Sequence, residues 1–186
     1  MIVCETARLR LRHLLDSDAP FILALLNEPD FIRNIGDREV RTAEDARRYI
    51  QHGPTASYSQ HGFGLWLVEL RDSGDPIGIC GLLKRDYLEH PDLGFALLPA
   101  FERRGFAYEA AHAVLNEAFS VMKFQKVLAI SLPENLASIR LLKRLGFEYR
   151  DQLQHENELL ASFEVRSEVF LALLSVPGSP ARSTAS

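Results

Sequence analysis

Residues 101–119 read FERRGFAYEAAHAVLNEAF, an arginine-rich turn that runs directly into a helix rich in small residues. Apolar side chains recur at helical spacing along one face of this segment, namely Ala107, Ala110, Ala111, Val114, Leu115, Ala118 and Phe119. The preceding residues 92–98 form a short apolar strand, which should end at Pro99 because proline lacks a backbone donor. The stretch therefore predicts a strand, a turn and a helix that packs closely on a sheet.

The turn at residues 102–105 is a candidate anion site. A strand that ends here and opens a helix at once leaves several backbone N–H groups unpaired and pointing one way. With the positive end of the helix dipole, these donors suit a phosphate or a diphosphate, and Gly105 allows close backbone approach. Arg103 and Arg104 can add forked contacts. The turn has neither a GK[ST] nor a GxGxxG pattern, and a solvated arginine-rich turn would show the same residues.

The whole chain predicts the element order β α α β β β α β α β β. This is an α/β fold with a mixed sheet and helices on both faces, not a doubly wound parallel sheet. The expected strands are residues 7–15, 63–70, 76–83, 92–98, 126–132, 147–153 and 162–173. The first helix uses Pro20 in its first turn and ends near Asn27, and a capping box at Thr42 starts the second helix, which Gly53 and Pro54 should stop. The segment between these two helices is expected to be irregular, and a last helix over residues 136–145 should end at Gly146.

Length and composition predict one domain with a short tail. The chain has 186 residues, so we expect a single domain over residues 1–173 and a disordered Ser/Pro/Ala-rich tail over residues 174–186. The formal net charge of -4 lacks the basic excess of a general nucleic-acid binder. Charged residues interrupt the N-terminal segment, so it has neither a signal-peptide apolar region nor the length of a membrane span.

The cysteines and histidines suggest no special chemistry. Cys4 and Cys80 form no CxxC pair and no disulfide framework, so a cytoplasmic location is the default expectation. The six histidines include no HExxH pattern and lie in separate predicted elements. We therefore expect no metal site.

Two motifs together resemble a known family. Gly105-Phe106-Ala107 with Glu109-Ala110 is followed by Asn135-Leu136-Ala137-Ser138 and then by Leu145-Gly146-Phe147. In this order and at this separation they resemble the GCN5-related N-acetyltransferase (GNAT) superfamily, and within it the ribosomal-protein N-acetyltransferase (RimJ/RimL)-like branch. The resemblance covers roughly residues 5–173 and is strongest over residues 92–147.

The resemblance implies a cleft that holds acetyl-CoA between two splayed parallel strands, residues 92–98 and 126–132. It implies these cofactor contacts: pantetheine on the backbone of Leu97 and Leu98, the pyrophosphate bracketed by Arg103, Arg104, Gly105, Phe106 and Ala107, Asn135 and Ser138 at the thioester end, and Lys143 at the nucleotide's extra phosphate. A solvated helix face would explain Lys143 equally well. Glu102 departs from the usual Gln or Arg, and Arg103 stands where glycine is common.

The resemblance also suggests catalytic residues. Many relatives protonate the departing thiolate with a tyrosine at the position of Leu142, so Ser138, directly or through water, is the candidate acid, with a plain helix-start serine as the alternative. Asp92 is the first candidate for the base that accepts the amine proton, with a solvated strand-edge aspartate as the alternative. Glu69, Tyr87, His90 and a chain of waters are rivals for this role. Backbone N–H groups of residues 92–98 are the expected oxyanion donors.

The expected activity is a cytosolic acetyl-CoA-dependent N-acetyltransferase in which an amine attacks directly within a ternary complex. The acceptor is a protein N-terminal α-amine or a small amine, bounded by residues 27–41 and the last two strands. A non-catalytic acyl-CoA-binding module is the main alternative, and a nucleotide-binding protein is a third. An exposed edge strand near the C-terminus could pair two copies into a homodimer.

Overall fold

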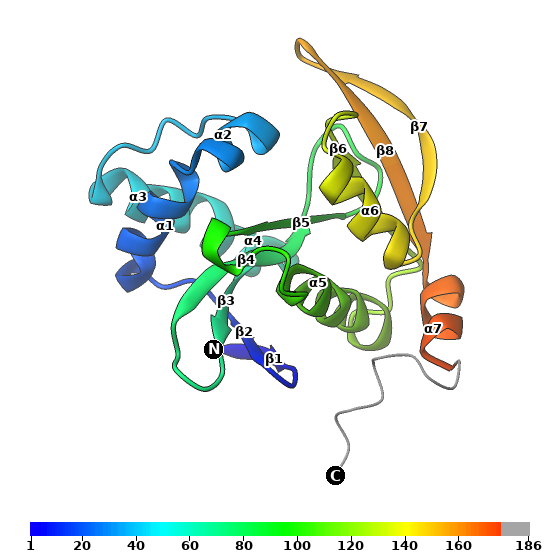
Figure 1. Cartoon of the computed structure of the whole chain (residues 1–186), viewed down its shortest axis with the longest axis horizontal. Helices are drawn as coiled ribbons and strands as arrows, with labels where there is room; N and C mark the ends of the chain where they lie inside the picture. Colours follow the sequence, from blue (N-terminus) through cyan, green and yellow to red (C-terminus); the bar gives the residue numbers. More distant parts are fainter. Residues whose placement is uncertain (176–186) are drawn as a thin grey trace.

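Within residues 1–175, which the computed structural model describes, eight strands form one open sheet in the order β1-β2-β3-β4-β5-β6-β8-β7 (Figure 1). The strands are Ile2–Glu5 (β1), Leu9–Arg12 (β2), Leu65–Leu70 (β3), Pro76–Leu83 (β4), Asp92–Leu97 (β5), Lys126–Ser131 (β6), Glu148–His155 (β7) and Glu158–Arg166 (β8). Neighbouring strands pair antiparallel except β5 and β6, which are parallel. The predicted mixed α/β sheet is confirmed.

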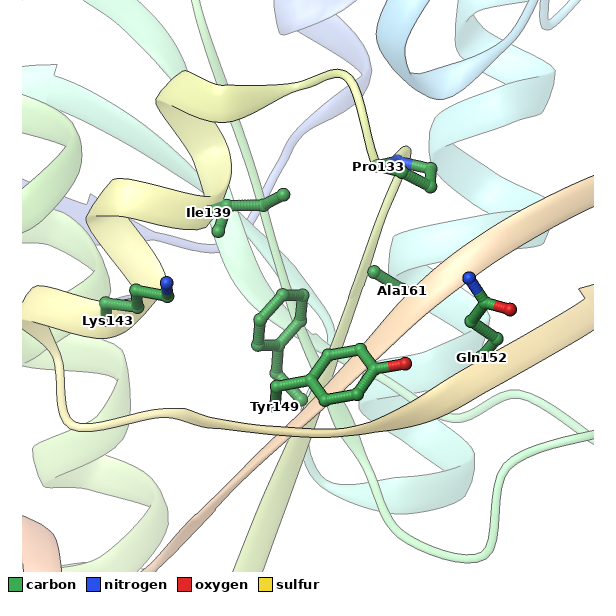
Figure 2. A pocket seen from close by; sticks show the side chains of 7 residues that line it. Pro133, Ile139, Lys143, Tyr149, Gln152 and Ala161 are labelled. Carbon is green, nitrogen blue, oxygen red and sulfur yellow. The ribbon is translucent and has the colours of Figure 1, made fainter.

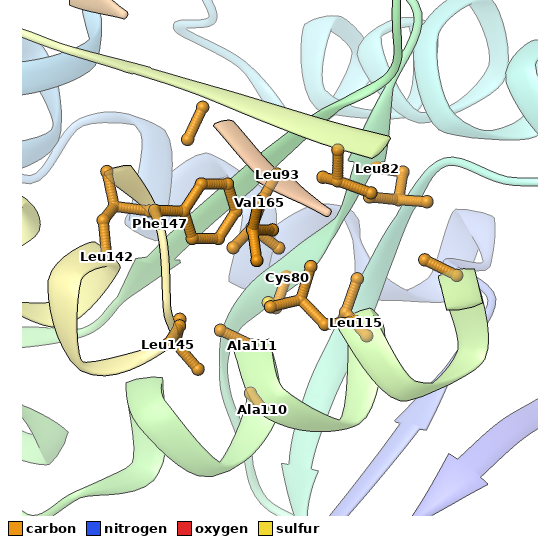
Figure 3. Close-up of a cluster of buried hydrophobic side chains, with 14 of the residues drawn as sticks. Cys80, Leu82, Leu93, Ala110, Ala111, Leu115, Leu142, Leu145, Phe147 and Val165 are labelled. Carbon is orange, nitrogen blue, oxygen red and sulfur yellow. The ribbon is translucent and has the colours of Figure 1, made fainter. Parts of the chain in front are cut away.

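Helices cover both faces of this sheet. They are Ala19–Leu26 (α1), Pro29–Ile35 (α2), Ala43–Ile50 (α3), Ala56–His61 (α4), Phe106–Asn116 (α5), Leu136–Arg144 (α6) and Ser167–Ser175 (α7). The sheet separates two hydrophobic cores, and successive side chains of β3 and β4 alternate between them. Trp66 and Cys80 lie in the core on the α5 side, whereas Leu67 and Ile79 lie in the core on the side of α1 and α3. Figure 3 shows the small residues Ala110 and Ala111 of α5 in the first core, close to the sheet.

The predicted helix starts are confirmed, but one predicted stop is wrong. Thr42 caps α3 by accepting from Asp45 N–H. Pro54 does not end the helical segment, because a π-helical turn over Gln51–Thr55 contains it and leads into α4, which Gly62 ends at φ +77°. The segment expected to be irregular contains α2, whose first residue is Pro29 and whose Phe31 is buried.

The ends of the sheet also differ from the prediction. Residues 7–15 do not form one strand, because β1 and β2 form a hairpin around residues 6–8. The strand expected at residues 162–173 ends at Arg166, and α7 follows, with Phe170 buried against His112 and Phe119. A short apolar run such as residues 169–174 fits either state by pattern alone.

Helix α7 extends to Ser175, two residues beyond the expected end of the domain. The rest of the predicted tail, residues 176–186, lies outside the described residues. Among residues 1–175, no helix has the length and apolar character needed to cross a bilayer.

Candidate active site

Strands β5 and β6 meet at one end and separate at the other. Their pairing has one register position, Asp92 opposite Leu128, where Leu128 N–H donates to Pro91 O at 2.9 Å. On its other edge β5 pairs with β4 along its whole length. Residues 94–97, beyond the register position, are half-buried and have no register partner in β6, and this unpaired edge of β5 is the cleft between the two strands.

The β4 ladder decides which backbone groups face the cleft. Leu98 N–H donates to Ile77 O at 2.9 Å, and in an antiparallel ladder every second residue bonds the same neighbour. The N–H and C=O groups of Phe95 and Leu97 therefore point away from β4, toward β6. The backbone groups of Leu98 are not directed to the cleft, because its N–H bonds Ile77 on β4 and its C=O accepts from Phe101 N–H at 2.9 Å. Of the two leucines predicted to pair with pantetheine, only Leu97 offers both groups to the cleft, and sequence reasoning missed Phe95.

The turn after β5 has the conformation of an anion site. Arg103 has φ +56° and Gly105 has φ +81°, so both lie in the left-handed region. The first helical bond of α5 runs from Glu109 N–H to Gly105 O at 3.0 Å, which leaves the N–H groups of Phe106 and Ala107 ahead of the ladder. The Arg104 guanidinium lies 5.1 Å from the centre of the Phe106 ring, whose side chain is buried. The structure thus brings all five predicted loop residues to one end of the cleft-forming strand β5.

A contact between Arg8 and Glu109, which sequence reasoning missed, braces this turn. The Arg8 guanidinium bonds Glu109 through Nε at 2.7 Å and Nη2 at 2.6 Å, and its Nη1 donates to Arg104 O at 3.1 Å. Thr6 Oγ1 donates to Glu109 Oε1 at 2.6 Å. Burial opposes ionisation of Glu109, but the hydrogen bonds from Thr6 and Arg8 outweigh it and lower the pKa of this carboxyl. Residues 101 positions apart form this contact, so no local sequence signal could reveal it.

Asn135 and Ser138 start α6 together. Asn135 Oδ1 accepts from Ser138 N–H at 3.1 Å and so caps the helix. The half-buried Ser138 lies in the first turn. Leu142, one turn further, is 1% exposed and belongs to the main core (Figure 3). The first turn of α6 therefore carries a hydroxyl, whereas the next turn carries a core side chain.

Lys143 and Arg144 lie on different flanks of α6. Lys143 and Ile139 line a cavity of about 260 Å³ with Tyr149 and Gln152 of β7 (Figure 2). The Arg144 guanidinium instead lies 4.5 Å from the centre of the Tyr108 ring in the first turn of α5. Arg144 is thus the basic residue of this pair that contacts α5.

Asp92 lies at the closed end of the cleft and is 1% exposed, so the alternative of a solvated aspartate is wrong. Arg85 Nε lies 3.0 Å from both of its carboxylate oxygens. Burial raises the pKa of Asp92 to about 6, and the attraction of Arg85 opposes the rise only in part. A carboxyl with this pKa can exchange a proton near neutral pH.

The rival bases are not equivalent in the structure. Arg85 Nη1 donates to Tyr87 Oη at 3.1 Å, which joins Tyr87 to Asp92 through one guanidinium. Glu69 instead lies on β3, where it pairs with Arg10 and Arg12 of β2. The structure therefore separates Glu69 from the strand that opens the cleft.

Comparison with known proteins agrees with this geometry. Residues 8–148 match the family model of the acetyltransferase (GNAT) domain. The uncharacterized N-acetyltransferase YoaA of Bacillus subtilis is 30% identical over 148 residues, 78% of this chain and 82% of YoaA.

Solved structures share the fold. A putative GNAT-family acetyltransferase from Bordetella pertussis has a TM-score of 0.75 at 24% identity, covering 88% of this chain and 98% of its own. RimL, a ribosomal alpha-N-protein acetyltransferase in complex with coenzyme A, has a TM-score of 0.76 at 15% identity, covering 89% and 98%. The family match spans the sheet from β2 to the start of β7 and includes the splayed strands and both predicted motifs. The chain therefore belongs to the GNAT family and is an N-acetyltransferase.

Proposed function

We propose that this chain binds acetyl-CoA between β5 and β6 and transfers its acetyl group to a primary amine within a ternary complex. The observation that carries the proposal is the single register position at Asp92 and Leu128, beyond which the edge of β5 is free. Pantetheine amides pair with the outward backbone groups of Leu97 and Phe95 as an added strand would. The family uses acetyl-CoA, and the similar fold of RimL is known with coenzyme A bound.

The turn at the end of β5 holds the diphosphate in this proposal. The N–H groups of Arg104, Gly105, Phe106 and Ala107 precede the helical ladder of α5, and the helix dipole adds positive potential. The exposed guanidinium groups of Arg103 and Arg104 supply charge at the rim. Asn135 and Ser138 face the thioester at the other end of the cofactor, and Arg144 joins Lys143 as a candidate for the nucleotide's extra phosphate.

The reaction needs one bond formed and one broken. The neutral amine nitrogen attacks the thioester carbon, and an outward backbone N–H of β5 stabilises the oxyanion. Collapse of this intermediate breaks the C–S bond. Asp92, directly or through water, takes the proton that the amine loses. Ser138, directly or through water, gives a proton to the thiolate and is reprotonated from solvent, so that CoA leaves as the thiol. Positioning of both substrates in one cleft supplies much of the remaining rate.

The acceptor in this proposal is a protein N-terminal α-amine, as in the RimJ/RimL-like branch, or a small amine. RimL, named for a ribosomal alpha-N-protein substrate, is an example of the first kind. Residues 27–41 and the β7–β8 hairpin bound the acceptor side, and the β7 edge could pair with a second copy in a homodimer. A cytoplasmic location fits an enzyme that uses acetyl-CoA.

Two measurements test the proposal. Acetyl-CoA at about 100 times its Kd should stabilise the fold by roughly 2.7 kcal/mol and raise Tm by several degrees, with NAD and ATP as controls that have no effect. Release of free CoA should then be followed over a panel of N-terminal peptides and small amines. Turnover with any amine supports the enzyme mechanism. Binding without turnover across the panel supports the non-catalytic acyl-CoA-binding module, for which the core position of Leu142 is the favouring observation.

A further inference from the structure

We propose that Arg8, held by Glu109, positions the diphosphate-binding turn and so sets the affinity of this enzyme for acetyl-CoA. The inference rests on the proposed cofactor site but adds a residue outside both family motifs. Arg8 lies in the β1–β2 hairpin connection, on the far side of the sheet order from β5. Its contacts nevertheless reach both the turn and the first helical turns of α5.

The donors of Arg8 are engaged within the chain. Nε and Nη2 bond Glu109 Oε2 at 2.7 and 2.6 Å, and Nη1 bonds Arg104 O at 3.1 Å. The backbone N–H of Arg8 adds a bond to Glu109 Oε1 at 3.0 Å. The guanidinium carbon also lies 4.3 Å from the centre of the Phe106 ring. Arg8 therefore acts on the turn as a brace and not as a phosphate ligand.

The contact with Arg104 O fixes the direction of a cofactor donor. Arg104 C=O and Gly105 N–H belong to the same planar trans peptide, so they point in opposite directions. When Arg8 holds the carbonyl oxygen, Gly105 N–H must point away from Arg8, toward the open side of the turn. The left-handed φ of Arg103 carries a cost that the surroundings must offset, and the Arg8 bracket is such a support.

Loss of the Arg8–Glu109 contact should affect cofactor affinity more than folding stability. The Arg8 side chain is 46% exposed and that of Glu109 is 18% exposed, and ion pairs of this kind add little to folding stability. Loss of the bracket should therefore leave the fold intact while the peptide of Arg104 and Gly105 becomes free to rotate. The expected defect is confined to ligands that carry the diphosphate.

The test compares CoA with pantetheine, which lacks the diphosphate. Calorimetry of Arg8→Met with CoA should show a roughly tenfold higher Kd, the loss of about one well-directed hydrogen bond. The affinity for pantetheine, measured by its competition with CoA, should be unchanged. Arg8→Lys should recover part of the affinity, since a lysine can reach one of the acceptors but not both.

The matched control is Arg10→Met on β2, which removes an arginine paired with Glu5 and Glu69 rather than with the turn. It should leave both affinities unchanged. Equal loss of CoA and pantetheine affinity in Arg8→Met would show a general structural role and overturn the inference, as would an unchanged Kd for CoA. No binding of CoA to the wild-type protein would instead refute the proposed function.

Glu109→Gln gives an independent variant in case Arg8→Met does not fold. The amide keeps one oxygen for Thr6 and for the Arg8 backbone N–H, but it loses Oε2, the oxygen that accepts from the guanidinium. Weaker CoA binding with normal pantetheine affinity supports positioning. Equal or tighter CoA binding would mean that the freed Arg8 contacts the diphosphate itself, and the inference would be wrong.

Discussion

Asp92 of β5 lies opposite Leu128 of β6, and no other pair of the two strands shares a register position among residues 1–175. Each strand is held along its length by its other neighbour, since β5 pairs with β4 and β6 pairs with β8. The two halves of the sheet therefore diverge from this position without loss of either ladder. The cleft is a consequence of strand order, and the buried Asp92 marks its closed end.

Asp92→Asn should lower kcat/KM by roughly 100-fold or more, because the variant cannot take the amine proton. Its KM for acetyl-CoA should change little, since the cofactor contacts lie further along β5. Initial rates at saturating acetyl-CoA test this expectation, and unchanged rates would show that a water chain or another group is the base.

The pH dependence of kcat/KM in the wild-type enzyme should report the ionisation of Asp92. Burial raises the pKa of Asp92 to about 6, and only the carboxylate form accepts a proton. The Asp92 contribution to kcat/KM should therefore rise as pH increases through about 6 and level off above it. This limb of the profile should be absent in Asp92→Asn, and its survival there would assign it to another group.

Ser138→Ala should lower kcat by roughly tenfold to 100-fold with little effect on the Kd of acetyl-CoA. The variant keeps the backbone N–H that donates to Asn135 Oδ1, so Tm should stay close to that of the wild type. Single-turnover release of CoA checks the first point and thermal unfolding the second. Wild-type rates would leave Ser138 as a helix-start residue only.

Gly105→Ala should cost about 1 kcal/mol of stability and also weaken acetyl-CoA binding. Its φ is +81°, and a β-carbon there would lie 3.4 Å from Arg8 Nη2, within the proposed diphosphate-binding turn. Gly62→Ala is the matched control, because its φ is +77° and its β-carbon would meet nothing within 4 Å. Both variants should lose similar stability in denaturant unfolding, whereas only Gly105→Ala should raise the Kd, and an equal Kd in the two would contradict the proposed diphosphate site.

The two basic residues in the last turn of α6 can be separated by one comparison. Arg144→Met should reduce the preference for CoA over dephospho-CoA, because Arg144 lies over Tyr108 at the start of α5. Lys143→Met should change this preference less, since Lys143 lines the cavity beside β7. A larger effect of Lys143→Met would favour the assignment made from the family resemblance.

The sequence predicted the strand, turn and helix of residues 92–119 because its signals are local. Pro99 fixes its own φ, Gly105 permits a left-handed φ, and the alanines of α5 identify the side of the helix that packs on the sheet. The rest depends on tertiary structure. Pro54 lies in a π-helical turn, and residues 169–174 are helical because Phe170 packs on Phe119. The backbone N–H and C=O groups of Phe95 face the cleft because of the register between β4 and β5.

The Arg8–Glu109 contact shows the same limit at the candidate site. Arg8 lies in the β1–β2 connection and Glu109 in α5, and no local sequence pattern at either residue predicts the other as its partner. The family resemblance predicts a diphosphate site at this turn, but only the folded chain shows what holds the turn in place.

Hydrogen–deuterium exchange with and without acetyl-CoA tests the central claim most directly, because it reports both binding and its place. We expect protection concentrated in residues 94–98 and 103–108, where outward N–H groups of β5 and the turn meet the cofactor. Residues 43–61, which span α3, the π-helical turn and α4, serve as the internal reference and should not change. Binding that protects other segments while leaving these two unchanged, or no protection at saturating acetyl-CoA, would contradict the account.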